Sequence, residues 1–256
     1  MGMAEPTRPS HSGIGLGTEV TVHESTAVLC EAVATEVVRG LADALSRRPS
    51  ASLVLTGGRA GTAVLAAIRE HAASRTVDWS RVDFYWGDER FVPADHPDRN
   101  ESQARHALLD HIPVDPARIH PMPASDGVHG NDLVAAAAAY RELVRAMGQE
   151  GFDVCLLGVG EDGHVASLFP GLPAMSERDL PVVAVTDSPK PPPSRITLTL
   201  PVIRRCDEVF LLATGSAKAS AVATALGANA DNLPAASVSG ASRTVWFLDT
   251  AAASEL

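Results

Sequence analysis

His164 is the residue of this sequence whose type and position are best suited to proton transfer. It follows Asp162 by two residues, in a turn that contains Gly158, Gly160 and Gly163. Histidine is the side chain whose ordinary pKa permits proton transfer near neutral pH. A buried strand that runs into a glycine-rich turn places reactive groups at the carboxyl edge of an α/β sheet. The pattern therefore predicts a general base at His164 beside Asp162, although a histidine that merely caps the turn fits it too.

The same glycines also match a dinucleotide-binding fingerprint. Residues 158–163 read GVGEDG, a literal GxGxxG, and Asp187 stands near the position of a ribose-binding acid. Such a site needs a long helix straight after the glycines, whose amino end binds the pyrophosphate. Here Pro170 and Gly171 would end such a helix, so residues 164–169 have room for only about one to two helical turns. The sequence therefore argues against a dinucleotide site.

A second group of reactive side chains follows the strand predicted at residues 81–86. Asp88, Glu89 and Arg90 are consecutive, and they stand with Asn100 in the polar, proline-interrupted segment of residues 87–102, which predicts a loop. Two acids and an arginine are costly to bury unless the charges pair. Solvated charges at the end of a strand explain the cluster as well. The functional alternative is an arginine that stabilises a developing anion and is held by its acidic neighbours.

Two further segments carry groups that bind anions. Gly57, Gly58 and Arg59 precede a predicted helix, where free backbone amides and the helix dipole attract phosphate. The segment lacks the Gly-Lys-Ser/Thr element of a Walker loop, and a plain tight turn explains it equally well. Lys218 stands in the first turn of another predicted helix, where its charge opposes the dipole, and the only other lysine is Lys190. We therefore consider Lys218 an anion ligand.

Hydrophobic periodicity predicts the elements that position these groups. Strands are expected at residues 19–23, 51–56, 81–86, 152–157, 180–186, 195–200, 207–213 and 243–248. Helices are expected at residues 26–47, 60–73, 101–110, 132–147 and 215–226. Arg195 opens one of the strands, where a simple surface charge is the alternative to an anion ligand. The alternation predicts a single α/β domain at residues 18–256, with a mostly parallel sheet and helices on both faces.

Composition narrows the class of protein. The chain has 256 residues and a formal net charge of −10, which disfavours nucleic acid as a partner because phosphate neutralisation supplies most of that affinity. Its three cysteines, Cys30, Cys155 and Cys206, lie in apolar segments without metal-ligand spacing and are expected to be buried core residues. Residues 1–17 lack the apolar core of a signal peptide and are expected to form a disordered leader. No apolar run is long enough to span a membrane. We expect a cytoplasmic protein, a monomer or weak homo-oligomer, that binds a small anionic molecule.

Taken together, the motifs resemble the 6-phosphogluconolactonases of the glucosamine-6-phosphate isomerase/6-phosphogluconolactonase family. The resemblance covers about residues 19–250 and rests on TGG at 56–58, WGDERFVP at 86–93, DHPDRN at 95–100, LGVGEDGHVASLFPG at 157–171, RITLTLPVI at 195–203 and LLATGSAKA at 211–219. It implies a NagB/RpiA-like, modified Rossmann-type fold without cofactor or metal. It also implies hydrolysis of 6-phospho-D-glucono-1,5-lactone to 6-phospho-D-gluconate, the second step of the oxidative pentose phosphate pathway.

The resemblance also implies roles for individual residues. His164 would activate a water, Asp162 would assist it, and Arg90 would stabilise the oxyanion. The positions implied around the phosphate and hydroxyls of the substrate are Gly57, Gly58, Arg59, Asp88, Glu89, Asn100, Arg195 and Lys218. Arg59 and Val165 depart from residues common in the family, which leaves the details of the phosphate site open.

Two other functions and one other catalytic mechanism compete with this hypothesis. Isomerisation or deamination of a sugar phosphate belongs to the sister group of the same family. A non-catalytic sugar-phosphate sensor usually carries a DNA-binding helix-turn-helix, for which the short polar leader has no room. Ser167 as a covalent nucleophile lacks the sharp strand-to-helix turn of a nucleophile elbow.

Overall fold

A six-stranded parallel sheet forms the centre of the molecule. The computed structural model describes residues 18–148, 151–228, 230 and 233–256, so the predicted leader lies outside the described residues. The strand order is β1–β9–β8–β5–β2–β3. These strands are β1 (Thr18–His23), β2 (Ala51–Leu55), β3 (Val82–Trp86), β5 (Val154–Gly158), β8 (Glu208–Ala213) and β9 (Arg243–Asp249). Every residue of β2 and β8 is buried, as expected for the near-continuous apolar strands of a parallel sheet covered on both faces.

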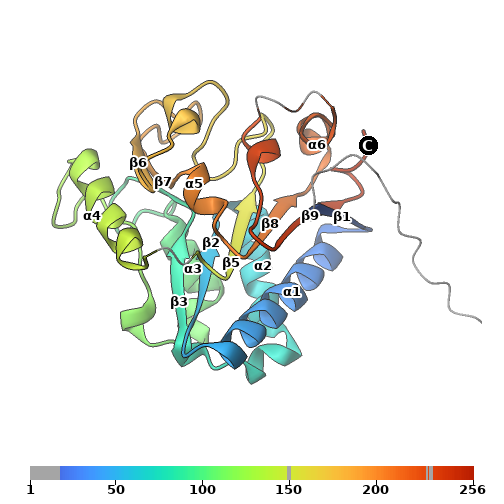
Figure 1. Cartoon of the computed structure of the whole chain (residues 1–256), viewed down its shortest axis with the longest axis horizontal. Helices are drawn as coiled ribbons and strands as arrows, with labels where there is room; N and C mark the ends of the chain where they lie inside the picture. Colours follow the sequence, from blue (N-terminus) through green and yellow to red (C-terminus); the bar gives the residue numbers. More distant parts are fainter. Residues whose placement is uncertain (1–17, 149–150, 229, 231–232) are drawn as a thin grey trace, which may run out of the picture.

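Helices cover both faces of this sheet, as predicted (Figure 1). The pair α1 (Thr26–Arg47) and α2 (Gly58–Glu70) pack against each other and against the strands. They connect β1 to β2 and β2 to β3, in one direction across the sheet, whereas α6 (Ala219–Leu226) connects β8 to β9 in the other. Because parallel crossovers are right-handed, opposite directions place their helices on opposite faces.

A second, three-stranded antiparallel sheet leaves the main sheet at Gly87. It has the order β4 (Asp88–Arg90), β7 (Arg195–Leu198) and β6 (Val182–Val185). The Gly87 amide donates to Leu55 of β2 at 2.9 Å, and its carbonyl accepts from Leu198 of β7 at 2.8 Å. Residues 88–90 were predicted to be loop, which is wrong, because β7 pairs with them from a distant part of the sequence. The helices α3 (Asn100–Ala107), α4 (Leu133–Ala146) and α5 (Leu200–Ile203) complete this half of the molecule, and α4 packs on β6 and β7.

The described segment of residues 164–169, which has room for a short helix, is instead a set of turns. Val165 forms an antiparallel bridge with Val159, and the Leu168 amide donates back to Val165 at 2.9 Å. The Ser167 amide donates to the Thr197 hydroxyl of β7 at 3.2 Å. These contacts fix residues 164–169 as turns between the two sheets, and a helix over the same residues would break them.

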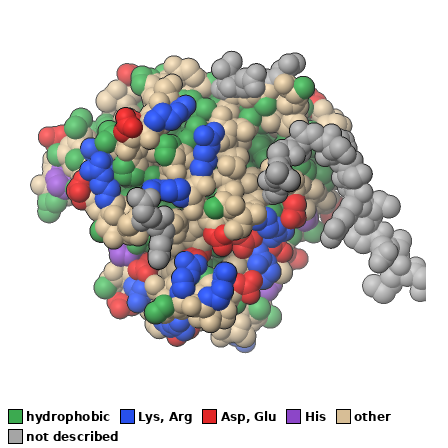
Figure 2. Space-filling model, viewed as in Figure 1, with side chains coloured by type: hydrophobic (Ala, Val, Ile, Leu, Met, Phe, Trp, Pro, Cys, Tyr) green, Lys and Arg blue, Asp and Glu red, His purple; other side chains and the backbone are tan. Residues whose placement is uncertain are grey.

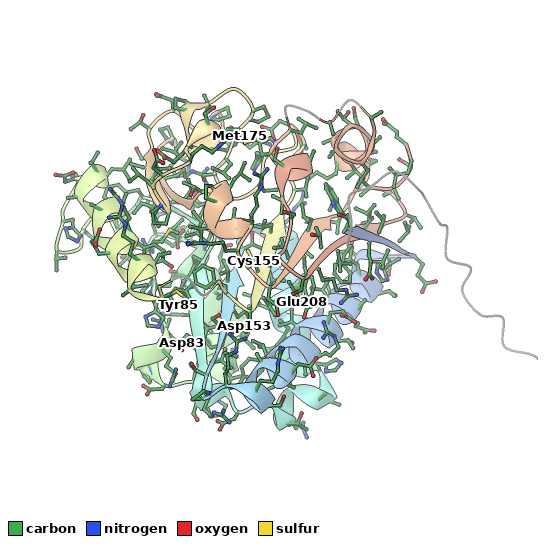
Figure 3. The ribbon with its side chains drawn as sticks, viewed as in Figure 1. Asp83, Tyr85, Asp153, Cys155, Met175 and Glu208 are labelled. Carbon is green, nitrogen blue, oxygen red and sulfur yellow. The ribbon has the colours of Figure 1, made fainter. Side chains whose placement is uncertain are left out.

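Acidic side chains at the amino ends of the parallel strands are paired with basic ones. Asp83, Asp153 and Glu208 lie at this lower edge in Figure 3. Asp83 accepts from Arg118 at 2.6 Å and contacts His120 at 2.9 Å. Asp153 pairs with Arg48 and also accepts from the Ser52 amide and hydroxyl. Glu208 pairs with Arg39 and Arg243. Figure 2 shows basic and acidic side chains interleaved over α1, so the surface in that region has mixed charge.

No helix in the described ranges is both long and apolar enough to cross a membrane. Cys30, Cys155 and Cys206 are free and buried, which confirms their prediction as core residues.

Candidate active site

The site lies at the carboxyl ends of β2 and β5, which are neighbours in the sheet. The chain leaves β2 towards β3 on one side, whereas it leaves β5 towards β8 on the other. This reversal is the topological switch point at which open α/β sheets bind ligands. The two loops are tied together there, because the Gly158 amide donates to the Thr56 hydroxyl at 3.3 Å. The glycine turn of residues 158–163 and the Gly57-Gly58 segment therefore lie side by side.

His164 and Asp162 form a hydrogen-bonded pair in the turn after β5. Nδ1 of His164 contacts Oδ1 of Asp162, which also accepts from the His164 backbone amide at 3.3 Å. The imidazole packs on the Phe169 ring with a centroid separation of 4.5 Å. A Cβ on Gly160 would overlap both the imidazole and the Asp162 carboxylate. Glycine at position 160 therefore lets the backbone approach the pair closely.

The electrostatics of this pair determine which nitrogen is basic. Burial raises the pKa of Asp162, but the hydrogen bond and charge of His164 outweigh it and lower that pKa overall. An ionised carboxylate only accepts hydrogen bonds, so Nδ1 of His164 carries the proton. Nε2 has no hydrogen-bond partner in the part of the chain that the structure describes. Its lone pair is therefore available to a ligand.

Burial is also the main influence on the pKa of His164. It lowers that pKa below the ordinary value, and the hydrogen bond and charge of Asp162 restore only part of the shift. His164 is therefore neutral near neutral pH, with a free basic nitrogen. This is the protonation state that a general base requires.

Asp88 lies beneath this pair and is almost completely buried. Its carboxylate accepts from the Ser167 hydroxyl at 2.6 Å and lies 3.8 Å from Nη1 of Arg195. Ser167 is 0% exposed, so its hydroxyl is enclosed and committed to Asp88. This burial argues against Ser167 as a nucleophile, in agreement with the sequence.

Arg90 reaches the site from strand β4. Its Nη1 donates to the Asp98 carbonyl at 2.9 Å and to the Asn100 side chain. The Asn100 amide in turn donates to the Asp88 carbonyl at 2.8 Å, and a Cβ on Gly57 would overlap it. Gly57, Asp88, Arg90 and Asn100 are thus brought together from separate loops. Nη2 of Arg90 has no hydrogen-bond partner among the described residues and remains available as a donor.

The structure corrects the prediction that Glu89 contacts the substrate. Glu89 is 1% exposed, and its carboxylate accepts hydrogen bonds only from backbone amides within the described ranges. Side chains alternate between the two faces of a strand, so the exposure of Arg90 to the site turns Glu89 into the interior. The sequence did not reveal this alternation because it showed no strand at residues 88–90.

Arg195 is also buried and organises a neighbouring loop. Its Nε donates to the Pro192 carbonyl at 2.7 Å, and its Nη2 donates to the carbonyls of Lys190 and Pro191 at 3.0 and 3.1 Å. The alternative of a simple surface charge is therefore wrong. Through these hydrogen bonds Arg195 holds the loop of residues 188–193, which contains Lys190, at the edge of the site.

Sequence reasoning missed Lys190 as a site residue. Its positive charge acts on both His164 and Lys218. The available signal was the scarcity of lysine, since Lys190 and Lys218 are the only two in the chain.

The charges of two further cations, Arg59 and Lys190, act on Lys218. Burial lowers the pKa of Lys218, and the charges of Lys190 and Arg59 lower it further, whereas Glu161 and Asp162 oppose that shift. When neighbouring cations lower the pKa of a lysine in this way, an anion placed among them stabilises their charged forms. Within the described ranges no three His, Cys, Asp or Glu side chains are grouped to hold a metal ion.

Comparison with known proteins identifies relatives over nearly the whole chain. The model of the family described as glucosamine-6-phosphate isomerases/6-phosphogluconolactonase matches residues 24–246. A 6-phosphogluconolactonase of Streptomyces coelicolor is 52% identical over 93% of this chain and 94% of its own. The solved 6-phosphogluconolactonase of Trypanosoma brucei has a TM-score of 0.81 at 29% identity, covering 93% of this chain and 98% of that one. A solved monomeric glucosamine-6-phosphate deaminase has a TM-score of 0.77 at 22% identity, covering 93% of this chain and 100% of its own, so the fold alone does not separate the two activities.

Proposed function

Because the chain belongs to the glucosamine-6-phosphate isomerase/6-phosphogluconolactonase family, we infer that it hydrolyses 6-phospho-D-glucono-1,5-lactone to 6-phospho-D-gluconate. This reaction is the second step of the oxidative pentose phosphate pathway. The observation that carries the inference is the His164–Asp162 pair, whose Nε2 is free of partners among the described residues and whose imidazole feels the positive charge of Lys190. A lactone is an activated ester, so a positioned base and an oxyanion donor suffice for its hydrolysis.

In the mechanism that we propose, His164 is the base. Its Nε2 takes a proton from a water, and the resulting hydroxide attacks the lactone carbonyl carbon. The Asp162 carboxylate stabilises the imidazolium that forms. Collapse of the tetrahedral intermediate breaks the bond to the ring oxygen, which receives the proton back from Nε2. The product carboxylic acid then ionises and releases one proton to solvent.

Arg90 is proposed to stabilise the tetrahedral oxyanion. Asn100 and the Asp98 carbonyl fix one arm of its guanidinium, and the Nη2 arm remains available. Arg59, Lys190 and Lys218, with the backbone amides of Gly57 and Gly58, are proposed to hold the phosphate. Asp88, Asn100 and Arg195 support these groups from below, because their side chains are buried and bonded within the protein.

The reaction is tested by following proton release from the phosphorylated lactone and subtracting the spontaneous rate. We expect a rate proportional to enzyme concentration and no ammonia from glucosamine 6-phosphate. Ammonia release without lactone turnover would instead support a deaminase. Binding of both sugar phosphates without turnover of either would support a sensor.

The pH dependence of kcat/KM reports the protonation of His164 in the free enzyme. A base must be neutral to act, so activity falls as the pH drops through its pKa. Because burial lowers that pKa from the ordinary 6.5, we expect the acidic limb of the profile to lie below 6.5. The measurement is a kcat/KM profile for lactone hydrolysis from acidic to neutral pH. A limb centred clearly above 6.5 would contradict the assignment.

Replacing Lys218 with alanine is expected to raise KM about ten-fold and to change kcat little, because a charge-assisted hydrogen bond to phosphate contributes about 1.5 kcal/mol to binding in both ground and transition states. The control is the substrate, since glucono-1,5-lactone has no phosphate. We expect the variant and the parent enzyme to hydrolyse that compound equally. An equal loss on both lactones would remove Lys218 from the phosphate site.

We further propose that the enzyme works in the cytoplasm as a monomer or weak homo-oligomer. Its net charge of −10 supports a role without nucleic acid or membrane.

A further inference from the structure

The Glu89 carboxylate joins strand β4 to the first turn of α3. Its Oε1 accepts from the backbone amides of Arg90 and Asn100, both at 2.8 Å, and its Oε2 accepts from the Glu101 amide at 2.9 Å. Two of these amides belong to the first residues of α3, where backbone donors lack partners within the helix. One buried side chain therefore connects the strand that carries Arg90 with the helix that carries Asn100.

Burial and the neighbouring donors have opposite effects on the charge of Glu89. Burial raises its pKa to about 7, and the charge of Arg99 and the three amides oppose the rise. Arg99 is itself 1% exposed, and its Nη2 lies 3.9 Å from Glu89 while donating to Glu101 and to the Met122 carbonyl at 2.8 Å each. A neutral amide of the same shape could accept the two bonds to Oε1 through its single oxygen, but its NH2 group could not accept the Glu101 amide at the position of Oε2.

The backbone atoms held by Glu89 carry the side chains that meet in the site. Arg90 and Asn100 are bound through their amides by the same oxygen, Oε1, and their side chains bond to each other through Nη1 and Oδ1. The Glu89 carboxylate, the two backbone amides and the hydrogen-bonded side chains of Arg90 and Asn100 therefore form a closed ring of contacts. A shift of either backbone would therefore move the guanidinium of Arg90.

We propose that Glu89 is a positioning residue for the reaction, which sets the direction of the Arg90 guanidinium by fixing the backbone at Arg90 and Asn100. The proposal rests on the proposed function, in which Arg90 stabilises the oxyanion. It separates Glu89 from the groups that touch the substrate, because the carboxylate is enclosed and its three acceptor bonds are all internal.

A double-mutant cycle with Arg90 tests the proposal, since a residue that acts only through Arg90 has no effect on turnover once Arg90 is gone. We expect Glu89→Gln to lower kcat about 10- to 100-fold in the parent enzyme, because a small misplacement of a catalytic group has effects of this order. In the Arg90→Ala background we expect the same change to lower kcat less than about two-fold. Thermal unfolding is measured for all four proteins.

Glu101→Gln is the matched control. Glu101 also pairs with Arg99 but contacts neither the Arg90 backbone nor its guanidinium through its side chain. We expect it to lower the unfolding temperature and leave kcat unchanged. If Glu89→Gln does not fold, Glu89→Asp keeps the charge with a shorter reach and is expected to give the same cycle.

Equal losses of kcat in the two backgrounds would overturn the proposal, as would an unchanged kcat in Glu89→Gln or Glu89→Asp. These results are distinct from failure of the proposed function, which would appear as absence of lactone hydrolysis in the parent enzyme.

Discussion

Replacing His164 with alanine is expected to lower kcat for lactone hydrolysis by about two to four orders of magnitude, the usual contribution of a positioned general base. Nε2 is the one nitrogen of the His164–Asp162 pair that is free to take a proton from water. The side chain is 17% exposed, so its loss leaves a small cavity at the surface and the fold is expected to survive. The measurement is proton release at neutral pH, with the spontaneous rate subtracted and circular dichroism recorded alongside.

His120 provides a matched control for this experiment. Its side chain is 21% exposed and contacts the Asp83 carboxylate at 2.9 Å, so it is also a partly buried histidine paired with an aspartate. It lies at the amino end of the sheet, away from the cations of the site. We expect His120→Ala to change stability without changing kcat. A folded His164→Ala variant with near-normal kcat would show that another group is the base.

Arg90→Ala is expected to lower kcat about 10²- to 10³-fold, as removal of one oxyanion donor does in other hydrolases. The reason is that Nη2 is left available as a donor while Asn100 and Asp98 hold the other arm of the guanidinium. The measurement is the separate determination of kcat and KM for the phosphorylated lactone. A rise in KM with unchanged kcat would instead assign Arg90 to phosphate binding.

Arg105→Ala controls for the general loss of an arginine near α3. Arg105 pairs with Glu101 on the partly exposed side of that helix and does not reach the proposed oxyanion. We expect its kcat to be unchanged.

The parallel sheet could be predicted because its signal is local. Each buried strand is an apolar run followed by a turn or helix, and the glycines at residues 57–58 and 158–163 mark where reactive loops begin. The sequence therefore predicts that His164, Asp162 and the loop after β2 follow the carboxyl ends of strands, where open α/β sheets bind ligands. The strand order that makes β2 and β5 neighbours is known only from the structure.

The small antiparallel sheet was not predictable in the same way. Residues 88–90 are charged, and they form a strand only because β7 pairs with them across the molecule. The orientation of Glu89 and the role of Arg195 in carrying Lys190 both depend on that pairing. The turns of residues 164–169 were also not predictable, since their contacts with Val159 and Thr197 come from other parts of the chain.

The paired acids at the amino ends of the strands have a consequence for how this enzyme can change over evolutionary time. Asp83, Asp153 and Glu208 anchor the pole of the molecule opposite to the reactive one. Adaptation to a hotter or saltier habitat can therefore proceed by exchanging charges at that pole. Substrate preference can drift independently through the loops at the other. Lineages that share the chemistry would then differ mainly in their stability to heat and salt.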